Sequence, residues 1–329
     1  MYKLNFKVNK KVDLLLVDNN YADFKFENIN YYILKNEIYL IYLIQSFIYS
    51  IGKFQFNLKT IKENYQIFLI KSLSPKIVIG HDMNGKLLKI KKLFPKIISI
   101  CYQLGNVWAG ENKIYKKIFS NNKIDYYFIY DKRIKKILKK IIKTKFIISG
   151  ALKNNEILVK NFKKKKYDIM YISQFRKRQS TSERKIEAKI LKLLDAYCLN
   201  HNKKLLIALA YNQFKIKKYK WEKDELEFIN QNCKKFYIEK KISPYTLADM
   251  SKTIVCFNSN LGLEMLAKEK KIIFFDLQKL YFKTYKNLNK TYILDNLIYE
   301  NFEKKIKFLF SLSKEKWKNK IKKDKMKIK

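Results

Sequence analysis

Short runs of β-branched and aromatic residues alternate along this chain with longer stretches of helical period, and no other feature constrains its fold as much. Such alternation is typical of parallel sheets whose strands are joined by covering helices. In the first half it predicts strands over residues 12–17, 76–80, 96–102, 124–130 and 145–148. It predicts helices over residues 31–51, 85–93 and 132–143.

The alternation restarts after a run of lysines at residues 163–166. Strands are then predicted over residues 167–173, 204–209, 235–238, 253–257 and 271–275. Helices are predicted over 182–200 and 223–231, from Pro244 with Ser243 as N-cap, from Leu261, and within 302–329. We therefore predict an α/β fold with two Rossmann-like parallel-sheet domains, residues 1–160 and 161–312, followed by a lysine-rich tail over 313–329.

The formal net charge of +43 raises the hypothesis of a nucleic-acid-binding or membrane-binding protein. Only four of the 72 basic residues are arginines, and the lysines are spread over both halves rather than clustered. We interpret most of this charge as solvated lysine side chains and predict no specific nucleic-acid partner. Attraction to anionic lipid or to polyanions is the alternative.

The longest apolar run, residues 38–51, is shorter than the roughly 20 residues that span a bilayer. It predicts a buried helix, with a helix lying in a membrane interface as the alternative. The N-terminus lacks the apolar core of a signal peptide, and the four cysteines form no CxxC pair. These features together predict a cytoplasmic protein with reduced, buried thiols.

Polar residues follow the predicted strands, and ligands of open parallel sheets bind beyond the carboxyl ends of the strands. The first half places Asp18 after one strand, and His81 and Asp82 after the next. Either His81 or Asp82 is a candidate general base, because both residue types can be tuned toward neutral pH. A structural role for the lone His81 is the alternative.

The second half places its candidate ligands at two strand ends and at one helix start. A helix start offers backbone N–H groups and a positive dipole to a phosphate, and an arginine adds a bidentate donor. For Ser259 and Glu264 the alternative is a helix cap with a dipole-complementing carboxylate. The candidate residues are Ser173, Arg176, Asn258, Ser259, Asn260, Gly262 and Glu264.

Several motifs are missing from the sequence, which contains no Walker A lysine motif, GxGxxG, GxSxG or DxD. Their absence argues against P-loop nucleotidases, dinucleotide oxidoreductases, α/β-hydrolases and metal-dependent transferases. The two histidines are far apart and belong to no metal-ligand spacing. We therefore predict no metal and no cofactor.

Five segments, in order, resemble a bacterial family of surface-carbohydrate or O-antigen biosynthesis proteins. Residues 75–84 read PKIVIGHDMN and resemble the family's PKIVIT-x-x-DNN, and residues 99–105 resemble its ISIQNG. Residues 148–155 are similar to GSxKNN, residues 171–176 to ISQYR, and residues 257–264 to FIDSTLGYE. Asn258 and Asn260 replace an acidic residue and a threonine of the last motif, Leu104 replaces an asparagine, and His81 stands where the family is apolar.

The resemblance implies a glycosyltransferase-like protein of GT-B architecture, in which two Rossmann-like domains face a central cleft. Its expected partners are a nucleotide-sugar donor, held by the second domain, and a glycan or lipid-linked acceptor, held by the first. The alternative is a member that binds a glycan precursor or a partner protein without catalysis. A lipid-linked acceptor also implies peripheral contact with the anionic inner face of the cytoplasmic membrane, for which Trp317, Ile321 and Ile328 of the lysine-rich tail are candidate contacts.

Overall fold

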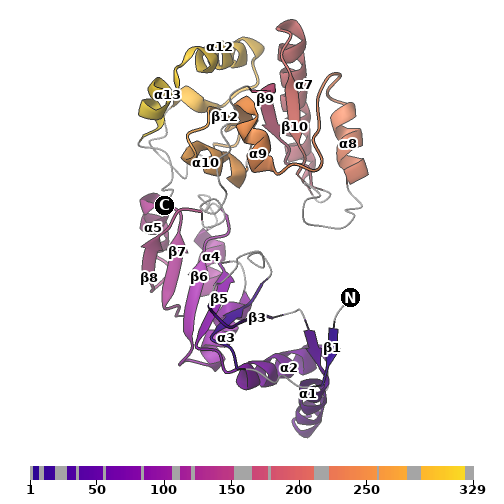
Figure 1. Ribbon diagram of the computed structural model, residues 1–329, viewed down its shortest axis with the longest axis vertical. Coiled ribbons are helices and arrows are strands. Elements are labelled where there is room, and N and C mark those ends of the chain that lie inside the picture. The colour runs from indigo at the N-terminus through magenta and orange to yellow at the C-terminus, as the bar shows by residue number, and fades with distance from the viewer. Residues whose placement is uncertain are drawn as a thin grey trace. The chain divides into compact units, whose positions relative to one another are not determined.

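The computed structural model describes residues 3–6, 11–18, 28–34, 37–54, 57–82, 85–105, 112–119, 123–151, 165–176, 179–210, 222–257, 259–279 and 290–322. The chain forms two compact units, each with its own parallel sheet (Figure 1). Unit 1 comprises Met1–Leu104 and Glu111–Ile148, and unit 2 comprises Gly105–Gly110 and Ser149–Lys329. The two Rossmann-like parallel-sheet domains expected from the sequence are thereby confirmed.

Unit 1 is built on a six-stranded sheet in which every neighbouring pair is parallel. Its strand order is β3 (Tyr31–Ile33), β2 (Leu14–Leu16), β5 (Ile77–His81), β6 (Ile98–Tyr102), β7 (Tyr126–Ile129) and β8 (Lys145–Ile148). The connecting helices include α3 (Gly85–Leu93), α4 (Asn112–Phe119) and α5 (Lys132–Leu138). All five strands predicted in this half are present, because buried parallel strands have the continuous apolar character on which the prediction rested.

The helix predicted over residues 31–51 is wrong in its first third. Tyr31–Ile33 forms strand β3 against β2, and Glu37–Tyr39 forms β4, which pairs with β1 (Lys3–Asn5). Helix α1 begins only at Leu40 and ends at Gly52, and it packs against α2 (Leu58–Leu73), which the sequence analysis did not predict. Aromatic and β-branched residues occur in both helices and strands. Here the pairing of β3 with β2 and of β4 with β1 selects the strand.

Unit 2 is built on a five-stranded parallel sheet. Its strand order is β10 (Leu205–Ala208), β9 (Tyr167–Ile172), β11 (Ser251–Cys256), β12 (Ile272–Phe275) and β13 (Ile293–Leu294). Its helices include α7 (Thr181–Asn200), α8 (Glu222–Asn230), α9 (Pro244–Asp249), α10 (Asn260–Ala267), α12 (Tyr299–Ser311) and α13 (Lys314–Ile321). The predicted cap is confirmed, since Ser243 Oγ accepts the Thr246 N–H at 3.2 Å. The predicted strand over 235–238 is reduced to a single bridge between Leu206 and Tyr237.

The C-terminal helix α13 belongs to the core of unit 2. Trp317 is 1% exposed, its indole Nε1 donates to the Glu269 carbonyl at 3.1 Å, and Ile321 is buried beside it. The expectation that these two side chains contact a membrane is therefore wrong, because their apolar surface is already covered by protein. Ile328 lies outside the described residues. No helix among the described residues has the length and apolar content needed to cross a bilayer.

Candidate functional site

Each sheet has one point where the strand order reverses, and ligands of open α/β sheets bind at that point. In unit 1 the chain runs from β2 to β3 on one side and returns to β5 on the other, so the reversal lies between β2 and β5. Asp18 follows β2, while His81 ends β5 and Asp82 follows it. In unit 2 the reversal lies between β9 and β11, which are followed by Ser173 and Ser259.

Asp82 is a buried carboxylate held by three donors. Its Oδ2 accepts the Tyr115 hydroxyl at 2.8 Å and the Tyr127 hydroxyl at 2.9 Å, and its Oδ1 accepts the Leu104 N–H at 3.3 Å. The side chain is only 2% exposed, and burial raises the pKa of Asp82 although its hydrogen bonds oppose that shift. Asp82 thus ties α4, β7 and the segment after β6 to the end of β5.

His81 occupies the more open position at the same strand end. Its side chain is half-buried, and its backbone N–H donates to Asp18 Oδ2 at 3.3 Å. Tyr102 donates its hydroxyl to Asp18 Oδ1 at 2.8 Å, and its ring meets the His81 ring edge-on at 6.2 Å. The structure therefore brings Asp18 and His81 together at the reversal point, with Tyr102 fixing both.

In unit 2 the turn after β9 is organised by Glu187 of α7. Glu187 is fully buried and accepts the Gln174 N–H at 2.7 Å, the Tyr171 hydroxyl at 3.1 Å and the Ser173 hydroxyl at 3.4 Å. Burial raises the pKa of Glu187 against these hydrogen bonds. Ser173 is accordingly buried and positions the turn. Glu187 was not among the residues predicted from the sequence. The available signal was a carboxylate within the apolar stripe of a helix, three residues before Ile190 and four before Leu191.

Arg176 lies on the exposed side of this turn. Its carbonyl accepts the Gln179 N–H at 3.0 Å and a guanidinium N–H of Arg184 at 3.4 Å. Its own guanidinium forms no ion pair with any residue of the described segments. Arg176 thus presents an exposed guanidinium group after the carboxyl end of β9.

The start of α10 contributes Ser259 and Asn260 to the same sheet edge. Ser259 is the N-cap and is 8% exposed, and because its Oγ accepts the Leu261 N–H at 3.2 Å, its hydroxyl can still donate a hydrogen bond. Asn260 is the first helical residue and is half-buried. Asn258, the other candidate of this turn, lies outside the described residues.

Two further candidates of this turn have structural roles. A Cβ at Gly262 would lie 2.4 Å from Cys256 Sγ and 2.8 Å from Phe274 Cε1, so its missing side chain lets α10 approach the sheet. The Gly262 N–H already donates to the Ser259 carbonyl at 3.1 Å. Glu264 is buried and accepts the Tyr245 hydroxyl of α9. Both residues were expected to contact a ligand. The structure instead places them in the packing of α10 against β11, β12 and α9.

The Gly262→Ala variant is expected to unfold at a lower denaturant concentration, with a loss of about 1–3 kcal/mol from overpacking. Helix propensity alone would favour alanine at this position by up to about 1 kcal/mol. The matched control is Gly85→Ala in α3, where nothing lies within 4 Å of the added Cβ. Urea unfolding followed by circular dichroism measures both variants, and equal midpoints would contradict the packing role of Gly262.

A family model described as "putative O-antigen biosynthesis protein" matches residues 103–328, which is more than half of the chain. The chain belongs to this family. The O-antigen biosynthesis match includes the candidate residues of unit 2, whereas His81 and Asp82 precede it. No match was found among curated proteins.

Solved structures share the fold of this O-antigen biosynthesis family member. One is a UDP-GlcNAc 2-epimerase from Methanocaldococcus jannaschii in complex with UDP-GlcNAc and UDP, at 14% identity and a TM-score of 0.51, covering 95% of this chain and 94% of that one. Another is an α,α-trehalose 6-phosphate synthase from Burkholderia multivorans, at 9% identity and a TM-score of 0.50, covering 91% and 81%. These likenesses confirm the GT-B-like fold class. No cluster of three or more metal-binding side chains occurs within the described segments.

Proposed function

We propose that this protein is a glycosyltransferase of surface-polysaccharide biosynthesis that moves a sugar from a nucleotide-sugar donor to a glycan or lipid-linked acceptor, without a metal ion. The observation that carries the proposal is the placement of Arg176 after β9 and of the Ser259 turn after β11, the two strands that flank the strand reversal of unit 2. The nucleotide sugar bound in the epimerase that shares this fold supports a donor of the same chemical class here.

In this proposal unit 2 holds the diphosphate of the donor. The Arg176 guanidinium matches phosphate oxygens with two parallel N–H groups, and the Ser259 hydroxyl and the positive end of α10 add donors. As the bond between the anomeric carbon and the phosphate oxygen breaks, negative charge accumulates on the leaving nucleoside diphosphate. Donors already fixed by the fold stabilise that charge without reorganising.

Unit 1 supplies the base. The acceptor hydroxyl gives its proton to the His81 imidazole while its oxygen bonds to the anomeric carbon, so the reaction releases a nucleoside diphosphate and leaves one proton on the protein. Asp82 is a poorer candidate for the base, because it is buried and both of its oxygens already accept hydrogen bonds. We assign it to positioning the end of β5 next to His81. A lipid-linked acceptor would place the reaction at the inner face of the cytoplasmic membrane.

The Arg176→Ala/Ser259→Ala double variant is expected to bind its nucleotide-sugar donor at least about tenfold more weakly, because two donors to a charged group are removed. Titration calorimetry over a panel of nucleotides and nucleotide sugars measures the change. Arg133→Ala is the matched control, since Arg133 pairs with Asp131 in unit 1 at 2.9 Å and should leave donor affinity unchanged. Equal donor affinities of the double variant and the wild type would show that the donor does not bind at Arg176 and Ser259.

The second candidate function is a non-catalytic glycan-precursor or partner-binding protein. It is favoured by Asn258 and Asn260, which stand where the family has an acidic residue and a threonine. Donor binding without hydrolysis or transfer across the same panel, with a glycan acceptor present, would support it.

A further inference from the structure

Helix α1 has its apolar face turned away from the protein. Its exposed side chains recur at intervals of three and four residues, which places them on one face. Its buried side chains, Tyr42, Ser46 and Ser50, form the opposite and more polar face. This arrangement is the reverse of an ordinary surface helix. The aliphatic and phenylalanine side chains of this exposed face are Leu40, Leu43, Ile44, Phe47, Ile48 and Ile51, and Gln45 and Tyr49 beside them are exposed as well.

Hydrogen bonds hold the polar face of α1 against the protein. The Tyr42 hydroxyl pairs with Ser72 Oγ of α2, and Asn64 Nδ2 of α2 donates to Ser50 Oγ at 2.9 Å. Ser46 Oγ donates to the Leu43 carbonyl at 2.7 Å. Turning the helix over would break the two bonds to α2 and leave Ser72 and Asn64 facing apolar side chains, so the outward apolar face is built into the fold. The prediction that residues 38–51 form a buried helix is wrong for this face.

The apolar surface continues beyond the helix. Ile48 is 63% exposed on α1, Phe54 after its end is 98% exposed, and Leu58 at the start of α2 is 86% exposed. A contiguous apolar surface of this kind on a folded protein marks a binding surface. We refer to residues 40–54 together with Leu58 as the α1 surface.

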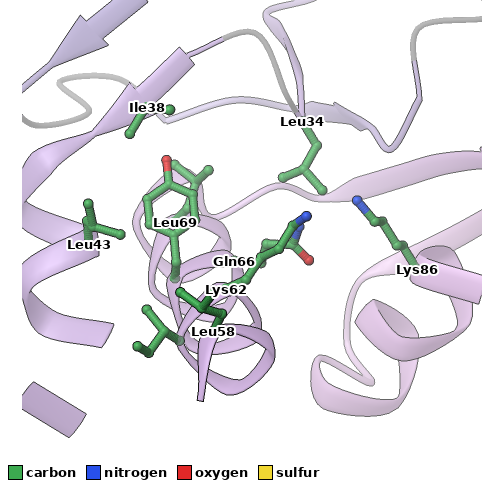
Figure 2. Close-up of a pocket in the computed structure, with 10 residues that line it drawn as sticks. Leu34, Ile38, Leu43, Leu58, Lys62, Gln66, Leu69 and Lys86 are labelled. Atoms are coloured by element: carbon green, nitrogen blue, oxygen red, sulfur yellow. The ribbon is translucent and has the colours of Figure 1, made fainter. Parts of the chain in front are cut away.

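A pocket of about 640 Å³ opens beside the α1 surface, between α1, α2 and α3 (Figure 2). Its walls are apolar, and Lys62 and Gln66 of α2 and Lys86 of α3 add polar groups to them. Figure 2 shows the Lys86 ammonium extending toward the pocket from α3. Apolar walls with ammonium groups at their edge suit a hydrocarbon chain that ends in an anionic group. The apolar lining includes Leu34, Ile38, Leu43, Leu58 and Leu69.

The charged residues nearest the α1 surface in the sequence are mainly lysines, and the first acidic residue after it, Glu63, is ion-paired with Lys89 at 2.6 Å. Residues 40–62 contain Lys53, Lys59 and Lys62 and no acidic residue, and all three lysines are exposed. An apolar helix face flanked by lysines is the pattern of a helix that lies in the interface of an anionic membrane. A second copy of this chain is a poorer occupant, because two surfaces with the same positive rim in molecules of charge +43 repel each other.

We propose that the α1 surface docks on an anionic lipid bilayer, with its apolar side chains among the acyl chains and Lys53, Lys59 and Lys62 at the phosphates. The membrane contact expected of the C-terminal tail is thereby reassigned to this surface, in line with the membrane-interface helix given as the alternative for residues 38–51. The proposal concerns attachment only and does not depend on any transferase activity, since its test uses no donor and no acceptor.

The test is cosedimentation with vesicles of phosphatidylglycerol and phosphatidylcholine, compared with phosphatidylcholine alone. The wild type should bind the anionic vesicles, and Ile48→Asp/Ile51→Asp should bind at least about tenfold more weakly. Ile114→Asp/Leu199→Asp is the matched control, because it adds the same charge at two apolar residues of similar exposure on α4 and α7. Unchanged binding by the α1 variant, or equal losses in both variants, would overturn the proposal.

A second measurement separates insertion from surface attraction. The four native cysteines are buried, so a cysteine introduced by Ile48→Cys or Leu199→Cys can be labelled with a polarity-sensitive fluorophore. Vesicles should shift the emission to the blue for residue 48 and leave residue 199 unchanged. The proposal fails if neither label shifts, which indicates lysine attraction alone. It also fails if sedimentation velocity finds a dimer that Ile48→Asp/Ile51→Asp dissolves while vesicle binding is absent.

Discussion

Replacing Trp317 with alanine is expected to lower the free energy of unfolding of unit 2 by about 3–5 kcal/mol, the cost of removing a buried tryptophan from a core. The indole is 1% exposed, meets the Tyr292 ring edge-on at 6.0 Å and donates Nε1 to the Glu269 carbonyl at 3.1 Å. The variant leaves a cavity beneath α13 and an acceptor that has lost its donor. Trp317→Phe should lose less, because it keeps most of the apolar volume.

Urea unfolding followed by circular dichroism measures this effect, with Lys316→Ala as the control. Lys316 is exposed on the same helix, so its replacement should change the free energy of unfolding by less than about 0.5 kcal/mol. A Trp317→Ala protein that unfolds like the wild type but loses vesicle binding would restore the tail as the membrane contact. Such a result would also contradict the assignment of α13 to the core of unit 2.

Replacing His81 with alanine is expected to reduce turnover by about a hundredfold to ten-thousandfold, the usual contribution of a positioned general base. The loss should fall on kcat, because in the proposed mechanism the imidazole receives its proton as the glycosidic bond forms. Donor affinity should be unchanged, since the diphosphate is assigned to unit 2. Initial rates of transfer from a nucleotide sugar, with calorimetry of the donor alongside, measure both quantities.

His201→Ala is the matched control for this experiment. His201 is the other histidine, lies at the end of α7 and pairs with Glu303 at 2.6 Å, away from either strand reversal. Its replacement should leave turnover within about twofold of the wild type. Full activity of the His81→Ala protein would exclude His81 as the base, whereas absence of transfer by the wild type would favour the non-catalytic alternative.

The sequence was sufficient to predict most strands of the two larger sheets and the region of the candidate site. The apolar runs Ile77–Ile79 of β5 and Ile254–Cys256 of β11 are rich in β-branched residues, so they stand out from the helical stretches around them. The polar residues that follow them, His81 and Ser259, could be named because parallel strands place their carboxyl ends at one edge. The strand ends that form the reversal point could not be identified from the sequence. Identifying them requires the strand order, which depends on pairings between residues far apart in the sequence.

Side-chain roles at that edge depended on packing that no local pattern records. Asp82 and His81 are neighbours in the sequence, yet two tyrosine hydroxyls from α4 and β7 enclose the first, while the second remains partly open. Gly262 resembled a phosphate-facing glycine, but its missing Cβ is needed where α10 crosses Cys256 and Phe274. These contacts join elements far apart in the chain, so only the folded structure determines them.

The sequence by itself determined that this chain forms two parallel α/β sheets with polar residues at their carboxyl ends, because strand and helix periodicity are local properties of the residues. The tertiary structure alone decided which apolar segments are buried. Residues 38–51 were predicted to form a buried helix, with a membrane-interface helix as the alternative, and the apolar face of α1 is exposed; Trp317 was a candidate membrane contact and is buried. Periodicity identifies an apolar face, but only the partners that pack on either side of a helix decide whether that face meets protein or solvent.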